Sequence, residues 1–330
     1  MKFSLILPTY NVEKYITACL ESCCQQVGIS PTDYEIIIVN DETPDGSIEV
    51  AQRVIDKYPD HKWQIVNREN GGLSAARNSG ILAAHGDYLW FIDSDDYIDR
   101  NALSVLSNVI ADDTYDIINF THKTVFKNNR IVGGDKYFEP RTCTGTDYLA
   151  CTNFLSAWTC LYRRSYIEEN NLRFKEGVIW EDSEFNIRAY TLTDNCYCIS
   201  DALYYYIRRE DSISDLRATG FSTNSRVSNA YGLDEYFQAS SFGKGQENAA
   251  YIRIASTLVS AIAGLPELEK TERSFFRKLI LAKKHAYWRI MMKCKDYRSV
   301  LPMLCFAVWP SLAEKILNKK IHEAIERSTK

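Results

Sequence analysis

Residues 70–96, NGGLSAARNSGILAAHGDYLWFIDSDD, contain the pattern that decides the fold. The glycine pair Gly71-Gly72 opens a segment with helical periodicity, and Gly86 closes it. The apolar run at 88–92 has the length and composition of a buried strand. Three carboxylates follow that run directly: Asp93, Asp95 and Asp96. The segment therefore predicts a helix, then a buried strand, then an acidic strand end.

The same alternation extends over the first 110 residues. Expected strands are Phe3–Leu7, Tyr34–Val39, Trp63–Asn67 and Tyr88–Ile92, and expected helices lie near 12–26, 46–58 and 73–85. Such alternation predicts a mostly parallel, doubly wound α/β sheet. Because ligands bind these sheets beyond the carboxyl ends of the strands, the residues that follow each strand are the candidates for chemistry.

The rest of the chain is first mixed and then helical. Expected elements are strands at Ile117–Phe120, Trp158–Tyr162 and Leu203–Ile207, a hairpin around Asn128-Asn129, a helix from about Glu181, and strong helices at Ala249–Ala263 and Phe275–Lys293. We therefore expect an α/β domain over 1–220 and a helical region over 221–330.

Composition excludes several classes of protein. With 45% hydrophobic and 25% charged residues, the chain of 330 residues is typical of a soluble globular protein, and a net charge of −4 argues against nucleic-acid binding. Ten scattered cysteines match no zinc spacing and indicate reduced cytosolic thiols. The N-terminus is too short for a signal-peptide core, and the best apolar run, Leu301–Pro310, is too short to span a membrane.

The Asp93-x-Asp95 pair predicts a metal site. Two like charges about 4 Å apart cost on the order of 4 kcal/mol at an intermediate dielectric, and a divalent cation such as Mg²⁺ or Mn²⁺ removes that conflict. The alternative is a solvated acidic turn. Of the three acids, Asp96 is the weakest candidate for a metal ligand, because it is also placed to cap a helix beginning near Asp99. After the second strand, Asp41 is a candidate to accept from a base N–H, and 45–47 suit a turn and a helix cap.

Five ordered motifs resemble the inverting family 2 glycosyltransferases with the GT-A fold. They are SLILPTYN at 4–11, VNDETPDGS at 39–47, NGGLSAARNSG at 70–80, WFIDSDD at 90–96 and WED at 180–182. The resemblance is strongest over the first 100 residues and continues to about residue 215. It implies a GT-A, Rossmann-like mixed sheet flanked by helices, with a nucleotide-sugar half over about 1–110, an acceptor half over about 111–220 and a C-terminal helical appendage.

The resemblance also implies roles for individual residues. Thr9 and Asp41 would lie at the nucleotide base, and Arg77 would reach the base or the diphosphate. Asp93 would lie near the ribose or the metal, and Asp95 would bind the metal, Mn²⁺ or Mg²⁺. The alternative for Arg77 is an ion pair with a carboxylate at the sheet edge.

Two positions depart from the family pattern. Many relatives carry two aspartates where this chain has Asn40-Asp41. The tyrosine-rich strand and Ser-Ile-Ser loop near 204–214 resemble those of polysaccharide-building members, but Asp215 stands where a histidine often follows. Arg208 and Arg209 in this loop would close over the diphosphate; the alternative is that both are ordinary surface charges.

Glu181 and Asp182 match the acidic pair that the family uses on the acceptor side. An acceptor hydroxyl that attacks the anomeric carbon must lose its proton, so the resemblance implies Asp182 as general base and Glu181 as its neighbour. From the residues alone, acids that favour a helix N-terminus explain the pair equally well.

The C-terminal tail is basic and aromatic. Residues 265–330 carry 15 Lys and Arg against 7 Asp and Glu. Apolar residues at 276, 280, 287 and 291 recur near helical spacing with lysines between them, and an apolar run at 301–309 and an amphipathic segment at 312–325 follow. Helices of this kind lie in membrane interfaces, so we expect peripheral contact with an anionic membrane through 271–330. The alternative is a helical cap packed on the catalytic domain.

The expected protein is a cytoplasmic, membrane-associated glycosyltransferase of surface-polysaccharide synthesis. It would move a hexose from a nucleotide-diphosphate sugar to a saccharide or lipid-linked saccharide. The expected donor is a UDP-sugar. The alternatives are a catalytically silent protein that binds sugar nucleotides or acts as a scaffold, and a sugar-nucleotide nucleotidyltransferase. Against the nucleotidyltransferase, the chain has no Gly-rich Arg/Lys signature after its first strand.

Overall fold

The computed structural model describes residues 1–128, 130–133, 140–152, 155–208 and 218–329. The chain divides into two compact units, one of Met1–Gly177 with Leu192–Glu210 and one of Val178–Thr191 with Asp211–Lys330. The range 1–220, expected to be the catalytic domain, thus takes in the whole first unit and also the helix α7 (Glu181–Thr191) of the second.

In the described part of the first unit, ten strands form one sheet in the order β3-β2-β1-β4-β9-β6-β10-β5, with β7 beside β6 and β8 beside β10. The strands are β1 (Phe3–Thr9), β2 (Tyr34–Asn40), β3 (Lys62–Asn67), β4 (Tyr88–Phe91), β5 (Tyr97–Ile98), β6 (Ile117–Val125), β7 (Ile131–Gly133), β8 (Arg141–Cys143), β9 (Cys160–Arg163) and β10 (Cys196–Ile207). The helices are α1 (Ile16–Cys24), α2 (Ser47–Lys57), α3 (Leu73–Ala83), α4 (Ala102–Asp112), α5 (Gly145–Cys151) and α6 (Arg164–Glu169).

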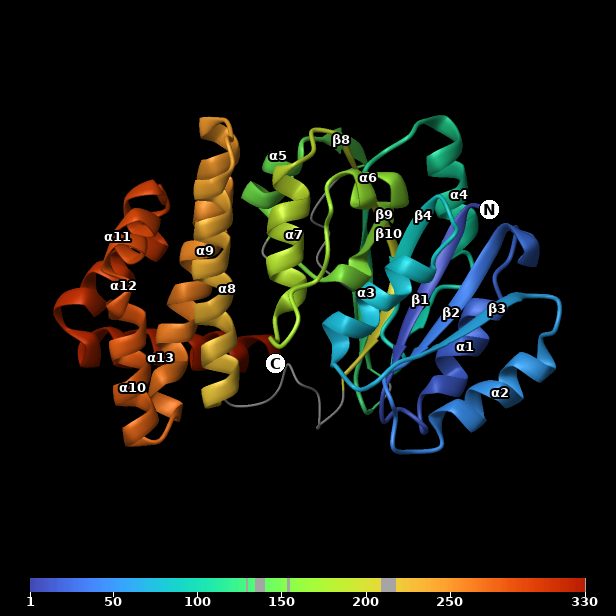
Figure 1. Ribbon diagram of the computed structural model, residues 1–330, viewed down its shortest axis with the longest axis horizontal. Helices are drawn as coiled ribbons and strands as arrows, with labels where there is room; N and C mark the ends of the chain where they lie inside the picture. The colour runs from blue at the N-terminus through green and yellow to red at the C-terminus, as the bar shows by residue number, and fades with distance from the viewer. Residues whose placement is uncertain (129, 134–139, 153–154, 209–217, 330) are drawn as a thin grey trace. The chain divides into compact units, whose positions relative to one another are not determined.

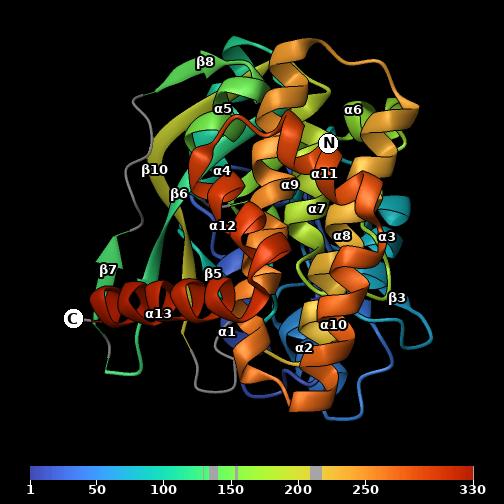
Figure 2. The same ribbon diagram turned by 90° about the vertical axis from the view of Figure 1, so that its left-hand side faces the viewer.

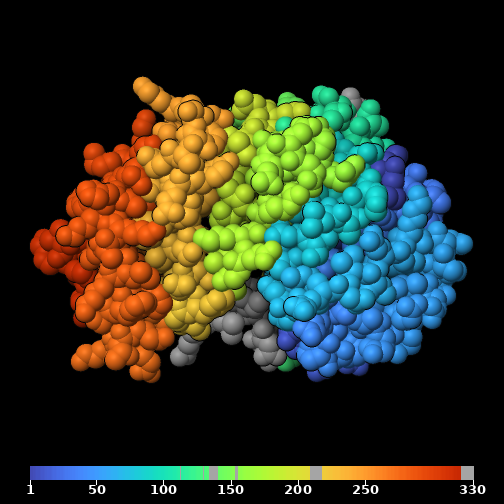
Figure 3. All heavy atoms as spheres, viewed as in Figure 1, coloured from blue at the N-terminus to red at the C-terminus, as the bar shows by residue number. Residues whose placement is uncertain are grey.

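The first four strands run parallel, as the alternating pattern predicts. Every residue of β1 and β4 is buried, because both faces of these strands are covered. Leu5 and Leu7 join the core that includes α1 and α2, while Ile6 faces α3. A Cβ at Gly80 would lie 2.2 Å from Ile6 Cγ2, so glycine lets α3 approach β1 closely. Figure 1 shows this layering, and the blue and cyan residues of this half form a continuous surface in Figure 3.

The second half of the sheet is mixed. β9 runs antiparallel to β4 and β6, whereas β10 runs parallel to β6. The hairpin of β6 and β7 is confirmed, with Val125 opposite Ile131; its residue Asn129 lies outside the described residues. β10 begins seven residues earlier than expected and follows β6 through bulges near Ala202. The prediction of a mixed sheet flanked by helices is confirmed.

Helices make up the described part of the second unit. Besides α7, they are α8 (Gly220–Ala239), α9 (Lys244–Gly264), α10 (Lys270–Ala282), α11 (Lys284–Lys293), α12 (Tyr297–Val308) and α13 (Pro310–Thr329). Figure 2 shows the orange and red helices grouped with α9, which packs against α7, α8, α11, α12 and α13. The single helix expected over 275–293 is wrong: Lys283, with ψ near 55°, lies between α10 and α11 as the C-cap of the first and the N-cap of the second.

One helix has the length and composition of a membrane span, which the sequence patterns did not predict. Within the described residues, Lys244–Glu267 is long and apolar enough to cross a membrane, contrary to the expectation that the chain has no such segment. More than half of its apolar window is buried inside the structure. Tyr251, Ile254 and Leu258 are all fully enclosed, which is how a core helix of a helical bundle behaves.

Ion pairs join the helices of this unit. The buried carboxylate of Asp234 on α8 pairs with Arg289 on α11, and the buried carboxylate of Glu314 on α13 pairs with Arg277 on α10. Two of the arginines in the basic tail are therefore held by protein carboxylates. These pairs connect α8 to α11 and α10 to α13.

Candidate functional site

The polar segments that follow the parallel strands meet at one sheet edge, as predicted. Thr9 is level with Asn40, and Asn40 with Asn67, so β1, β2 and β3 end in line. β4 runs parallel to β1 and ends on the same side, which brings Asp93 to this edge. This is the edge at which α/β sheets bind their ligands.

Asp41 shapes the loop that begins α3. Its carboxylate, only 3% exposed, accepts hydrogen bonds from the backbone N–H groups of Gly71 (3.0 Å) and Gly72 (2.8 Å) and pairs with Arg68. Gly72 has φ +81°, a conformation that favours glycine. Sequence reasoning missed Arg68, because nothing in the strand and helix periods separates it from a surface charge. Contact between Asp41 and a nucleotide base stays a prediction.

Thr9 is fully buried and faces the loop that follows β4. Its Oγ1 lies 3.1 Å from the carbonyl oxygen of Leu7 and 3.3 Å from Ser94 Oγ, and the Ser94 hydroxyl donates to Pro8 O at 2.7 Å. These bonds join the end of β1 to the acidic segment. The predicted contact of Thr9 with a base stays a prediction.

Arg77 pairs with Asp93. The guanidinium is 2% exposed, its Nη2 donates to Asp93 Oδ1 at 2.9 Å, and its centre lies 5.2 Å from the ring centre of Phe174. The ion pair with a sheet-edge carboxylate, which was the alternative role for Arg77, is therefore present. Contact of Arg77 with a base or a diphosphate stays a prediction.

Asp96 is a buried acid within this loop. It is 2% exposed and accepts hydrogen bonds from the Tyr204 hydroxyl at 2.8 Å and from Ile207 N–H at 2.7 Å. Burial, and then the charge of Asp93, raise the pKa of Asp96 well above its usual range. The suggestion that Asp96 caps a helix near Asp99 is wrong, because α4 begins only at Ala102.

The fold thus gives each of the three acids after β4 different surroundings. Asp93 faces Arg77, Asp96 is buried with a raised pKa, and Asp95 is half-buried in the same loop. Among the described residues, no group of three or more His, Cys, Asp and Glu side chains is arranged to hold a metal. A cation bound by Asp93 and Asp95 would therefore need further oxygen ligands.

Asp45 serves as a turn residue, as expected, whereas the N-cap position of α2 is Gly46, which makes no side-chain cap hydrogen bond. Its carboxylate accepts hydrogen bonds from the Ser47 and Thr43 hydroxyls (2.5 and 2.7 Å) and from the backbone N–H groups of Glu13 and Ser47. Burial opposes ionisation, but these bonds outweigh it and lower the pKa of Asp45 to about 2. The segment between β2 and α2 is therefore fixed by its own hydrogen bonds.

The end of β10 approaches the acidic loop through Ile207. The next residue, Arg208, donates from its backbone N–H to Val125 O at 2.9 Å, and its guanidinium lies 5.8 Å from the ring centre of Phe126. Arg209, which was expected to cover the diphosphate, and Asp215, which stands where relatives often carry a histidine, lie outside the described residues.

Glu181 and Asp182 form the first turn of α7 in the second unit. Glu181 is buried and Asp182 half-buried, with Asp182 Oδ1 accepting from Ser183 N–H at 2.7 Å. Trp180, with φ +62°, precedes them and lies 4.6 Å from the Arg226 guanidinium. The two acids occupy the N-terminus of α7, as expected if they only favour a helix N-terminus. A catalytic role for them stays a prediction.

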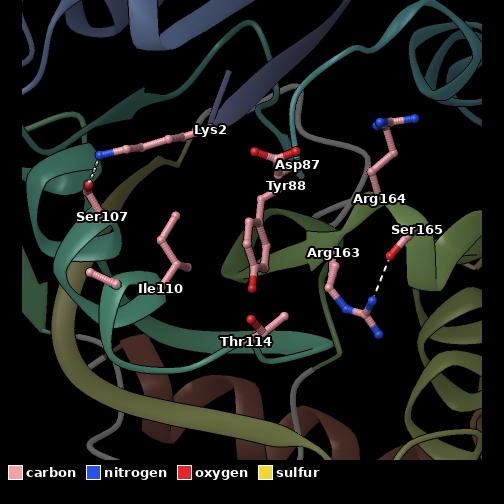
Figure 4. Close-up of a pocket in the computed structure, with 10 residues that line it drawn as sticks. Lys2, Asp87, Tyr88, Ser107, Ile110, Thr114, Arg163, Arg164 and Ser165 are labelled. Atoms are coloured by element: carbon pink, nitrogen blue, oxygen red, sulfur yellow. Dashed lines mark hydrogen bonds between the residues drawn. The ribbon is translucent and has the colours of Figure 1, made fainter.

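A pocket of about 470 Å³ lies at the opposite edge of the sheet, at the amino ends of β1 and β4 (Figure 4). Lys2, Asp87, Arg163 and Arg164 line it, and the Lys2 ammonium donates to Ser107 Oγ at 2.8 Å. It contains none of the predicted site residues. The candidate site is therefore defined by the strand ends and not by this cavity.

Comparisons with known proteins point to one family. The model described as glycosyl transferase family 2 matches residues 4–170, just over half of the chain. The uncharacterized glycosyltransferase EpsJ of Bacillus subtilis (strain 168) is 32% identical over 221 residues, covering 64% of this chain and 63% of EpsJ. Poly(ribitol-phosphate) beta-N-acetylglucosaminyltransferase TarS of Staphylococcus aureus (strain Mu50 / ATCC 700699) is 31% identical over 214 residues, covering 64% and 36%. The matches thus span less than two thirds of these relatives' own lengths.

Solved structures share the fold. S. aureus TarS 1-349 in complex with UDP-GlcNAc superposes with a TM-score of 0.73 at 21% identity, covering 98% of this chain and 92% of that chain. A mannosyltransferase from Pyrobaculum calidifontis in complex with GDP-Man and Mn²⁺ gives 0.54 at 15% identity, covering 93% and 87%. At these identities the likeness establishes the fold alone, and the predicted GT-A arrangement is confirmed.

Proposed function

The chain belongs to glycosyl transferase family 2, and from that premise we propose that it transfers a hexose from a nucleotide-diphosphate sugar to a glycan with inversion at the anomeric carbon. The observation that carries the proposal is the convergence of Thr9, Asp41 and Asp93 on one sheet edge. UDP-hexose is the proposed donor. The complexes of TarS with UDP-GlcNAc and with UDP support this choice.

A divalent cation, Mn²⁺ or Mg²⁺, is proposed to bind through Asp93 and Asp95. Two carboxylates in one loop are a fitting donor set, because Mg²⁺ commonly takes one or two protein carboxylates and completes its shell with water and phosphate oxygens. The Mn²⁺ in the mannosyltransferase complex is consistent with this. When bound, the cation would neutralise charge that develops on the departing diphosphate.

The chain's own residues are proposed to do the rest. Arg77 orients Asp93 and supplies positive charge beside the diphosphate, and Arg208, with Arg209, is proposed to cover it and exclude water. Asp182 is the proposed general base: it removes the acceptor hydroxyl proton while that oxygen bonds to the anomeric carbon and the bond to the nucleoside diphosphate breaks. Glu181 helps to bind the acceptor.

The proposed acceptor is a saccharide, lipid-linked, in the synthesis of a surface polysaccharide at the cytoplasmic face of the membrane. The names of relatives support a polymer acceptor, since TarS and a Bacillus spizizenii (strain ATCC 23059 / NRRL B-14472 / W23) enzyme are described as acting on poly(ribitol-phosphate).

An exposed apolar face on α12 and α13 supports membrane contact. Tyr297, Leu301, Leu304 and Val308 recur at helical spacing on α12 and are 41–70% exposed. Trp309, Leu312 and Ile316 extend the exposed face onto α13. Exposed basic residues, Lys295, Arg298 and Lys315, accompany it and would complement anionic lipid. Four of the apolar residues in the range predicted to contact lipid are instead buried: Phe276, Ile280, Tyr287 and Met291.

Vesicle flotation tests this face. With vesicles of phosphatidylcholine and about one third phosphatidylglycerol, the protein should float at low salt and less at high salt. A Leu301→Ser, Val308→Ser double variant should stay at the bottom, whereas Leu82→Ser, at an even more exposed apolar site on α3, should float as wild type does. Concentration-dependent dimerisation lost in the double variant, without flotation of wild type, would assign the face to a second copy.

A binding and transfer screen tests the function itself. UDP-, GDP-, CMP- and dTDP-sugars are titrated with Mn²⁺, then with a chelator, and transfer to an acceptor panel is followed by mass spectrometry. UDP-sugar binding lost on chelation and restored by Mn²⁺ is the expected result; metal-independent binding of every donor would contradict it. Donor binding without hydrolysis or transfer favours the catalytically silent protein, and pyrophosphate release from UTP and a sugar phosphate favours the nucleotidyltransferase.

A further inference from the structure

Two thiols of the first unit lie in contact on neighbouring strands. β8 runs antiparallel to β10, and Cys143 Sγ on β8 lies 3.7 Å from Cys198 Sγ on β10. All ten cysteines of the chain are free thiols in the structure. No role in the proposed transfer reaction uses this pair.

The register makes the contact a specific one. Cys143 is directly opposite Cys196, so Cys198 is its diagonal neighbour on the same face of β10. On its other side Cys198 Sγ accepts from Asn119 Nδ2 at 3.7 Å. Of the two thiols that Cys143 faces across the strands, Cys198 is thus the one in hydrogen-bonding contact.

The two thiols differ in the way that a reactive and a resolving cysteine differ. Cys143 is half-buried, and the hydrogen bond from Cys198 followed by the charge of Arg141 lowers its pKa, with burial opposing. Cys198 is fully buried, and its hydrogen bond to Cys143 together with burial raises its pKa. Cys143 is therefore the thiol that a small oxidant reaches first, and its lowered pKa favours the reactive thiolate more than the raised pKa of Cys198 does.

We propose that Cys143 and Cys198 form a reversible oxidation site for hydroperoxides. The Cys143 thiolate attacks the terminal peroxide oxygen, the O–O bond breaks, and Cys143 becomes a sulfenic acid as an alcohol or water leaves. The Cys198 thiol then attacks the Cys143 sulfur and expels water. The net change is one hydroperoxide and two thiols to one disulfide, one alcohol or water, and one water. A disulfide needs about 2.05 Å between the sulfurs, so the two side chains, now 3.7 Å apart at Sγ, must approach each other on oxidation.

Peroxide titration of the full chain tests the proposal. One equivalent of hydrogen peroxide should remove two of the ten thiols in wild type, and dithiothreitol should restore them. Tandem mass spectrometry of the unreduced digest should join the tryptic peptides 142–163 and 189–208 through Cys143 and Cys198. In Cys198→Ser the disulfide should be lost, and dimedone should label Cys143 instead.

Two control variants test whether the disulfide is specific to Cys143 and Cys198. Cys196→Ser removes the thiol directly opposite Cys143, and Cys151→Ser removes an exposed thiol on α5; both variants should lose two thiols as wild type does. A disulfide through Cys196, dimedone labelling of Cys143 in wild type without any disulfide, or ten thiols surviving the peroxide would each overturn the proposal. The wild-type peptide map decides the matter even where a variant fails to fold. None of these readouts depends on glycosyl transfer.

Discussion

The Tyr204 hydroxyl donates to the Asp96 carboxyl group at 2.8 Å while it accepts the backbone N–H of Asp93 at 3.1 Å. The tyrosine is fully buried and stacks on Trp158, with ring centres 4.4 Å apart. One side chain of β10 thereby holds both ends of the acidic segment after β4. The position of the proposed metal ligands depends on a residue more than 100 positions away in the chain.

Tyr204→Phe should loosen this segment. The variant removes the acceptor of the Asp93 N–H and one of the two hydrogen-bond donors to the Asp96 carboxyl group, so we expect a loss of about 1–3 kcal/mol in the free energy of unfolding and weaker donor binding. Urea unfolding and calorimetric titration with UDP-sugar measure the two effects. Tyr205→Phe, whose hydroxyl bonds Asp99 at 3.2 Å, is the matched control. Equal behaviour of the two variants would remove Tyr204 as a positioning residue.

Asp96→Asn should make stability less dependent on pH. Because the folded pKa of Asp96 is raised, the folded state binds more protons than the unfolded state once pH exceeds about 4, and stability falls as pH rises toward the folded pKa. Asparagine resembles the neutral acid and does not ionise. We expect the variant to gain stability over wild type from about pH 5 upward and to match it below pH 4. Melting temperatures over this range would show no such divergence if Asp96 were ionised in the fold.

Asp45→Asn should affect the pH dependence of stability in the opposite direction from Asp96→Asn. Hydrogen bonds lower the folded pKa to about 2, so the carboxylate stabilises the fold above its unfolded pKa near 4, and this contribution disappears as pH falls toward 2. We expect a loss of about 1–2 kcal/mol at pH 7, moderated because the side chain is partly exposed. Denaturant curves at pH 7 and pH 3 test the trend, with a constant difference as the contrary result.

Arg77→Lys should weaken donor binding while keeping the charge. Lysine lacks the planar guanidinium that reaches Asp93 and packs on Phe174, so we expect kcat/KM to fall at least about tenfold. Arg68→Lys is the comparison, since it alters the partner of Asp41 in the neighbouring loop. Unchanged kcat/KM with UDP-sugar in Arg77→Lys would contradict a role beside the diphosphate.

Asp182→Asn should separate binding from transfer. We expect donor and metal binding to persist while transfer falls by several orders of magnitude, because the acceptor hydroxyl loses its base. Glu184→Gln alters another acid in the first turn of α7, one that pairs with Arg188, and should retain most activity. Turnover near the wild-type rate in Asp182→Asn would remove it as the base.

Local patterns predicted most of the first 110 residues. The strands Phe3–Thr9 and Tyr34–Asn40 and the helix Leu73–Ala83 lie where short apolar runs and helical periods place them, because each signal resides in a few consecutive residues. The long β10 and the division at Lys283 were not predictable in this way. The extent of β10 depends on its pairing with β6, and burial of Ile280 and Tyr287 depends on which helices pack against them.

The sequence by itself determined that acids follow a buried strand at a ligand-binding sheet edge, since strand period and strand ends are local properties. Only the tertiary structure decided how those acids differ. Asp93 faces buried Arg77, and Asp96 is buried against Tyr204, where burial and the charge of Asp93 raise its pKa. The physical reason is that ionisation depends on burial and neighbouring charge, and residues distant in the chain supply both.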